Sequence, residues 1–159
     1  MDEFAVLREL FADEPATVHE LRAAWERARS LFATVHDKYE SGVLRDELNR
    51  HATTANEALL LELVRETLAR EGLTDDVVAA VFTAQEWDNG CFLNEHARVV
   101  RRDGARIRFD FGEAVEDVLI EEYGPVGRDA AVGVDLRSGT MTFDIDASNV
   151  FARIAATNS

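Results

Sequence analysis

The chain has 159 residues, of which 47% are hydrophobic and 30% charged, so its composition is that of a globular protein. Acidic residues outnumber basic ones by 31 to 17, which gives a formal net charge of −14. This sign disfavours direct binding to nucleic acids and to anionic membranes, because their phosphate groups attract basic proteins. No apolar run approaches the ~20 residues of a membrane span. The single cysteine, Cys91, has no internal disulfide partner, so we expect a cytoplasmic protein.

The range 18–39 has the clearest helical periodicity of the chain. Such a seam is suited to packing along another helix, and we expect it to form part of a bundle core. The alternative is that it forms the interface of a homodimer. The apolar residues recur at alternating spacings of three and four, at Val18, Leu21, Trp25, Ala28, Phe32, Val35 and Tyr39.

Two further helices are expected before residue 90. Thr54 and Glu57 have the spacing of a capping box, which predicts that a leucine-rich helix begins there and ends at Gly72. Thr74 is then expected to cap a fourth helix, which carries several valines and ends at Asn89-Gly90. With a short helix near the N-terminus and the 18–39 helix, this gives a layer of about four helices over residues 1–89.

After Gly90 the apolar period changes to two, which indicates strands. A loop around Gly104 predicts a first hairpin in which Arg101 lies opposite Ala105. A Ser138-Gly139 loop predicts a second hairpin in which Leu136 lies opposite Met141. Between the hairpins, the apolar spacing predicts a helix that stops at Gly124-Pro125, and a last helix is expected around 150–154.

The predicted fold class is therefore α+β: an N-terminal bundle of about four helices packed on an antiparallel sheet of two hairpins with an intervening helix. One domain, 1–159, is expected, with a helical layer at 1–89 and a ββ-α-ββ-α layer at 90–159. That second order, in a small acidic protein, resembles type III secretion chaperones in outline. The helical residues in front of it depart from that pattern.

The stretch 86–96, EWDNGCFLNEH, concentrates the chemically reactive side chains of the chain. The obvious nucleophile and base are Cys91 and His96, but residues five apart in a strand point to opposite faces. His96 is instead expected opposite Asp110 as a cross-strand charge pair. Trp87 is expected to pack at the end of the fourth helix. We therefore predict no catalytic residue, no metal site and no cofactor.

Five arginines lie within eleven residues of an otherwise acidic chain, and three of them, Arg98, Arg106 and Arg108, are candidate partner-binding residues. The second hairpin is expected to present three acidic candidates outward. The simplest interpretation is that the two hairpins are neighbours whose charges compensate each other. The alternatives are a solvated edge strand and a patch that binds an acidic partner or a phosphate backbone. The three acidic candidates are Asp135, Asp144 and Asp146.

From the charge and the missing catalytic pattern, we expect a non-enzymatic module that masks a basic protein partner. Bacterial immunity proteins, antitoxins, inhibitors and secretion-chaperone-like proteins are of this class. The first alternative is a small-ligand-binding protein or enzyme with a pocket between bundle and sheet. The second is a DNA-mimic inhibitor whose carboxylates stand in for phosphates.

Overall fold

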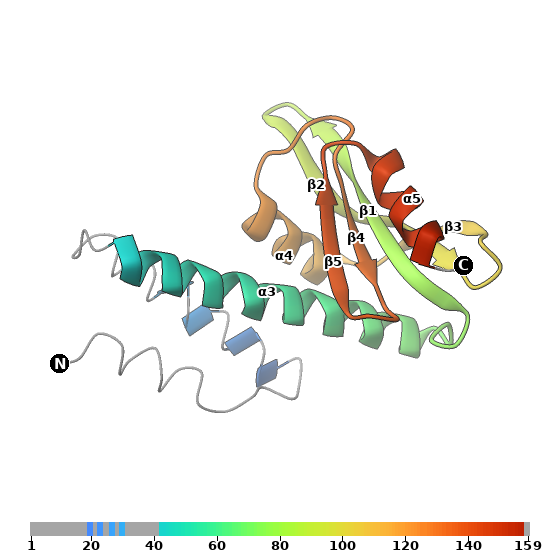
Figure 1. The fold of residues 1–159 in the computed structure, drawn as a ribbon, viewed down its shortest axis with the longest axis horizontal. Helices are drawn as coiled ribbons and strands as arrows, with labels where there is room; N and C mark the ends of the chain where they lie inside the picture. The colour runs from blue at the N-terminus through green and yellow to red at the C-terminus, as the bar shows by residue number, and fades with distance from the viewer. Residues whose placement is uncertain (1–18, 21, 24–25, 28, 31–41, 158–159) are drawn as a thin grey trace. The chain divides into compact units, whose positions relative to one another are not determined.

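The computed structural model describes residues 19–20, 22–23, 26–27, 29–30 and 42–157 (Figure 1). The chain forms two compact units, Met1–Glu62 and Leu63–Ser159. All seven apolar positions of the 18–39 seam lie outside the described residues, so its role in a bundle core or a homodimer stays a prediction. The described residues between those positions are helical.

Helix α3 spans Gly42–Arg70 without a break, so the prediction that a helix begins at Thr54 is wrong. The Thr54 hydroxyl donates a hydrogen bond to the carbonyl of Arg50 one turn earlier, at 3.0 Å, and this satisfies the side chain inside the helix. The predicted end is confirmed. Gly72 has φ 70°, and the amide of Leu73 donates to the carbonyl of Leu68 at 2.9 Å, which closes a Schellman motif.

The segment expected to be a fourth helix is strand β1, Val77–Trp87, and within the described residues no N-terminal four-helix bundle is seen. Its first six residues are all buried, because β1 pairs with β2 on one side and β4 on the other and is covered on both faces. A strand buried on both faces gives a continuous apolar run instead of an alternating one. The β-branched residues Val77, Val78 and Val81 favour the extended form.

The strands form one antiparallel sheet in the order β3-β2-β1-β4-β5. Strands β2, Gly90–Arg101, and β3, Arg106–Asp110, pair in the predicted register, with Ala97 opposite Phe109 and His96 opposite Asp110. Gly104 has φ 89°, and the amide of Arg101 donates to the carbonyl of Ala105 at 2.8 Å. The first hairpin is therefore confirmed in detail.

The second hairpin, β4 (Ala131–Asp135) and β5 (Thr140–Asp144), differs from its predicted register by two residues. Met141 lies opposite Val134, not Leu136. The Asp135 carboxylate explains this longer loop, because its Oδ1 accepts the amide of Arg137 at 2.9 Å and so ends the strand early. A shift of two keeps each side chain on its predicted face.

Helices cover both faces of the sheet, where one covered face was predicted (Figure 1). Helix α5, Ala147–Thr157, packs on the face of Gly133, where Val150 and Ile154 fill the space that a side chain would occupy. Helix α4, Glu113–Tyr123, stacks its Tyr123 on Phe143, which belongs to the opposite face. Val115, Val118 and Leu119 are the buried residues of α4.

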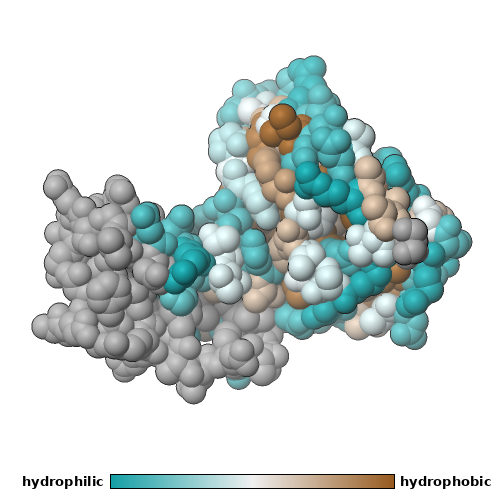
Figure 2. Space-filling view, viewed as in Figure 1, coloured by the Kyte–Doolittle hydropathy of each residue, from teal (hydrophilic) through white to brown (hydrophobic). Residues whose placement is uncertain are grey.

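No helix in the described part of the chain is long and apolar enough to cross a membrane. Hydrophilic residues dominate the view in Figure 2, and the hydrophobic areas between them are small.

Candidate functional site

The arginines that the sequence marks as candidates lie on one face of the β2–β3 pair. Arg98 is the cross-strand partner of Arg108 and of Val81, and Val81 is the partner of Gly133, so all four residues share the face on which α5 packs. Helix α5 packs mainly on the β1, β4 and β5 part of that face, and the buried Val100 of β2 belongs to the same core cluster. Arg98, Arg106 and Arg108 are exposed on the remaining β2–β3 part.

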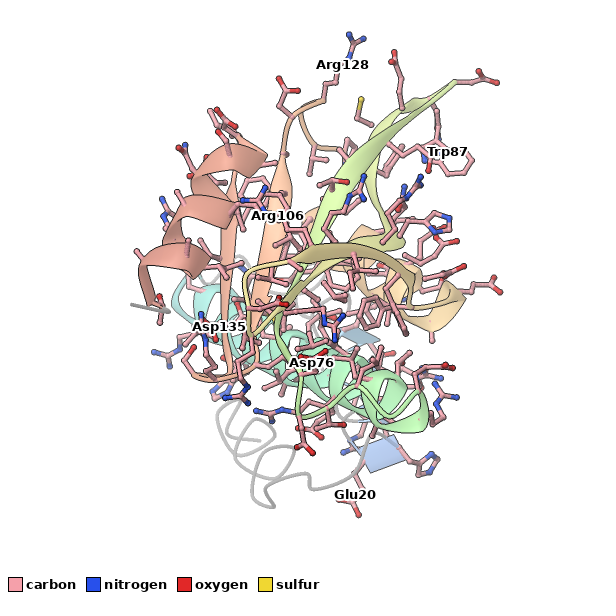
Figure 3. All side chains as sticks on the ribbon, turned by 90° about the vertical axis from the view of Figure 1, so that its right-hand side faces the viewer. Glu20, Asp76, Trp87, Arg106, Arg128 and Asp135 are labelled. Carbon is pink, nitrogen blue, oxygen red and sulfur yellow. The ribbon has the colours of Figure 1, made fainter. Side chains whose placement is uncertain are left out.

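Arg106 is the one member of this group with a defined contact. Its guanidinium carbon lies 3.9 Å from the centroid of the Phe151 ring on α5, which is the geometry of a cation–π interaction. Figure 3 shows Arg106 beside α5, viewed from the side of the molecule on which β3 lies. Arg98 and Arg108 form no ion pair with any other residue that the structure describes.

The acidic candidates of the second hairpin do not compensate these arginines. Strand β1 separates the two hairpins, so β3 and β5 lie at opposite edges of the sheet, and the prediction that they are neighbours is wrong. Asp135 pairs instead with Arg137, at 2.9 Å between Oδ2 and Nη2, and Asp144 pairs with Arg153 at 3.1 Å. Sequence reasoning missed both arginines, although each lies close in the chain to its carboxylate.

Asp146 caps helix α5. Its Oδ1 accepts the amide of Ser148 at 2.9 Å and the hydroxyl of Ser148 at 2.6 Å. The hydrogen bonds from Ser148 lower the pKa of Asp146 below its ordinary value. The pKa of Asp144 is also lowered, first by the hydrogen bond from the amide of Asp146 and then by that from the Asn149 side chain. Both aspartates thus have local structural roles.

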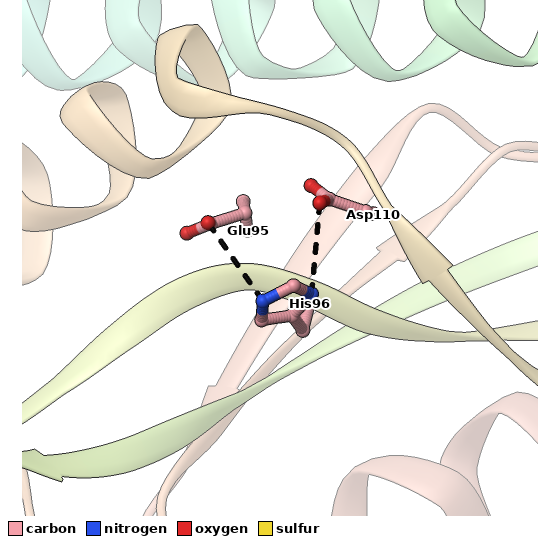
Figure 4. Close-up of side chains that lie close together, drawn as sticks. All are labelled: Glu95, His96 and Asp110. Carbon is pink, nitrogen blue, oxygen red and sulfur yellow. Dashed lines mark ion pairs between the residues drawn. The ribbon is translucent and has the colours of Figure 1, made fainter.

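The predicted pair of His96 and Asp110 is present, and Glu95 joins it (Figure 4). His96 Nδ1 lies 3.9 Å from Asp110 Oδ2, and His96 Nε2 lies 3.8 Å from Glu95 Oε1. The three side chains offer one nitrogen and two oxygens, all within 4.8 Å of one another, and such donors suit divalent first-row metal ions. His96 and Asp110 are exposed, and each carboxylate faces a different ring nitrogen, so a doubly flanked imidazole describes the group best.

Glu95 and His96 lie together because β2 has a bulge there. Phe82 pairs with Ala97, but Ala84 pairs with Leu93, so β2 has two residues more than β1 between the two pairs. In a regular strand these two neighbours would point to opposite faces of the sheet. The signal for the bulge is Asn94, a polar residue in a buried position, which is only 7% exposed.

The bulge depends on both polar atoms of the Asn94 side chain. Its Nδ2 donates to Gln85 Oε1 at 2.5 Å, and its Oδ1 accepts the amide of His96 at 2.8 Å. We expect Asn94→Ala to lower the free energy of unfolding by about 2 kcal/mol, because two hydrogen bonds are lost at a buried position. Gln85→Ala, which removes one of them, should cost about half as much. Urea unfolding of both variants measures this, and equal costs would contradict the role of Asn94.

Trp87 is the last residue of β1, and its side chain is 49% exposed. The prediction that Trp87 lies at the end of a helix and packs there is therefore wrong. Asp88 and Asn89 connect it to β2, where Trp87 is the partner of Gly90. The stretch 86–96 is thus the tip of the β1–β2 hairpin followed by the bulge. Both features belong to the architecture of the sheet.

A second charged surface, which sequence reasoning missed, lies on α4. Five of the eleven residues of this helix are acidic, and the chain has no lysine or arginine between Arg108 and Arg128. Glu113 and Asp117, one turn apart, are both exposed. The absence of lysine and arginine between Arg108 and Arg128 is the feature of the sequence that could have indicated this surface. The acidic residues of α4 are Glu113, Glu116, Asp117, Glu121 and Glu122.

Comparison of the chain with protein-family models found no matching family, and comparisons with curated proteins and with solved structures found no match. Only the geometry and charge of the described residues therefore bear on function.

Proposed function

We propose that this chain is a non-enzymatic, cytoplasmic protein-binding module whose basic protein partner docks on the outer surface of α4. The observation that carries this proposal is the run of acidic residues on α4 with no base between Arg108 and Arg128. The buried Val115, Val118 and Leu119 fix the opposite side of the helix, so the acidic side chains are presented on a supported element.

The helix dipole favours Glu113 and Glu116, which lie in the first turn of α4, but the spacing and position of the other acidic residues carry electrostatic costs within the helix. Glu113 and Asp117, and Asp117 and Glu121, are spaced four residues apart, and each such like-charge pair costs about 0.2–0.5 kcal/mol. Glu121 and Glu122 lie in the last turn, at the negative end of the helix dipole, where a base would be favourable. A surface that is kept acidic against these costs fits the electrostatic guidance of a basic partner.

Asp117→Lys tests the proposal, because it should affect stability and binding in opposite directions. The substitution replaces two repulsive pairs by two attractive ones and should raise the free energy of unfolding by about 1 kcal/mol. It should also abolish capture of the partner. Asp88→Lys is the matched control, because it makes the same change of charge at the exposed β1–β2 turn.

The measurement is affinity capture from a lysate of the source cells with wild type, Asp117→Lys and Asp88→Lys. We expect a basic protein on wild type and on Asp88→Lys that is released by about 0.5 M salt, which screens charges beyond a few ångströms. It should be absent from Asp117→Lys. Capture of no basic protein by the wild type, or equal capture by all three chains, would contradict the proposal.

A further inference from the structure

Strand β3 is the edge of the sheet at which the arginines lie, and its backbone has an open side. In the β2–β3 ladder the amide of Arg101 donates to Ala105, and the amide of Phe111 donates to Glu95. In an antiparallel ladder the hydrogen-bonded pairs alternate with pairs whose backbone groups point away. The backbone N–H and C=O groups of Arg106 and Arg108 therefore point outward, and no strand of the described residues pairs with them.

The side chains of β3 alternate in charge and polarity. Arg106 and Arg108 lie on the face that α5 partly covers, with Arg98 directly across from Arg108. On the other face Ile107 is 43% exposed, and the ring centroid of Phe109 lies 4.7 Å from that of Phe111. A strand added to this edge would thus meet guanidinium groups on one face and apolar side chains on the other.

We propose that β3 binds an extended segment of a partner protein by strand addition, and that this segment has two acidic residues spaced two apart with an apolar residue between them. Charge complementarity selects this occupant, because each guanidinium group fits a carboxylate with paired hydrogen bonds. Asp110, next along the same face, excludes a third acidic residue. The segment hydrogen-bonds to the backbone of Arg106 and Arg108, and its alternate side chains give the specificity.

A second copy of this chain fits the same edge less well. Antiparallel pairing of β3 with another β3 over most of the strand sets at least one arginine opposite an arginine of the other copy, and like charges directly opposite are destabilising. The register that sets Arg108 opposite Asp110 of the other copy pairs only three residues of each strand. Arg106 is also held in place by Phe151, so one of the two guanidinium groups is positioned before the segment arrives. This inference goes beyond the α4 interface, and its variants leave α4 unchanged.

The test is titration of the full chain with a synthetic peptide of about eight residues in which two aspartates flank one valine and the other residues are uncharged strand formers. Chemical shifts of the β3 amides report the site, and the titration gives Kd. We expect Arg108→Gln to weaken binding about threefold, because it removes one exposed ion pair. Arg108→Pro should weaken it about fivefold more, since proline lacks the outward N–H but leaves the ladder to β2 intact. Arg98→Gln is a second charge variant and should also weaken binding.

Arg128→Gln is the matched control, because Arg128 pairs with Glu86 at 3.2 Å in an exposed position outside the β2–β3 face. It should leave Kd unchanged. Binding to Arg108→Pro that equals binding to Arg108→Gln would overturn strand addition. So would equal binding of a peptide with the same composition in blocks, or tighter binding of a single-stranded oligonucleotide at the same amides. Absence of any shift in the β3 amides would overturn the site itself.

Discussion

Replacing Gly133 by alanine is expected to lower the free energy of unfolding by about 1–3 kcal/mol, and replacing it by valine by more. A Cβ at this position would lie 2.6 Å from Val150 Cγ1, which is closer than Cβ atoms approach other atoms in proteins, and at a tight 3.3 Å from Ile154 Cδ1. Val150 is 1% exposed and has no room to retreat. Glycine is therefore needed in the middle of β4 so that α5 can approach the sheet.

A double-mutant cycle separates this contact from the general cost of changing a strand glycine. Val150→Ala alone should cost about 2 kcal/mol by leaving a cavity. Combined with Gly133→Ala it should cost clearly less than the sum, because the new methyl group fills that cavity. Urea unfolding of the four proteins gives the coupling energy. Strict additivity would contradict the packing of α5 against Gly133.

The second large effect is expected at Asp135, whose replacement by alanine should cost about 2 kcal/mol at neutral pH. Its carboxylate accepts hydrogen bonds from the Arg137 amide at 2.9 Å and from Arg137 Nε at 3.1 Å, and Arg137 Nη2 also donates to the Ile154 carbonyl of α5 at 3.1 Å. These contacts fix the β4–β5 loop and connect it to the end of the last helix. Asp135 is therefore the central residue of this loop.

The contribution of Asp135 should depend on pH. Burial alone would raise the pKa of Asp135, but the side-chain and backbone hydrogen bonds from Arg137 outweigh it and the pKa is lowered. A carboxylate whose pKa is lowered by folding stabilises the fold at every pH above its pKa in the unfolded chain, which is about 3.9. This stabilisation is lost as the pH falls from that value through the lowered pKa of the folded state.

Urea unfolding of wild type and Asp135→Ala at neutral pH and near pH 3 measures this dependence. The difference between the two proteins should shrink in acid. Asp88→Ala, at an exposed position where the structure gives no side-chain hydrogen bond, is the control and should change little at either pH. A difference between wild type and Asp135→Ala that is constant across this range would contradict the role of the ionised carboxylate.

Local patterns in the sequence were sufficient where one short-range rule decides the structure. The Gly104 loop fixed the register of the first hairpin, and Gly72 gave the end of α3, because in both cases a residue with positive φ is required. The register of the second hairpin was wrong by two, because the bonds of one carboxylate, Asp135, set the loop length. The tendency of Asp135 to accept a hydrogen bond from a nearby backbone amide is also local, but Ser138-Gly139 was the stronger turn signal in the sequence and hid it.

The larger error, a helix in place of β1, came from tertiary structure. A central strand buried on both faces has no alternation to read, and a run of valine and alanine is compatible with either structure. The same error hid the layout of the charges, because β1 separates the two hairpins that were expected to be neighbours. Arg98 lies opposite Arg108, as the predicted register of the first hairpin implies, but the bulge that brings Glu95 to His96 depends on pairing with β1.

The central claim is that the acidic surface of α4 guides a basic partner, and the most direct test is the association rate of the captured partner measured against ionic strength. The rate for the wild type should fall steeply with added salt, and Asp117→Lys should lower the rate at low salt and flatten the dependence. Asp88→Lys should behave as the wild type. An association rate that is indifferent to salt, or that Asp117→Lys leaves unchanged, would contradict the claim.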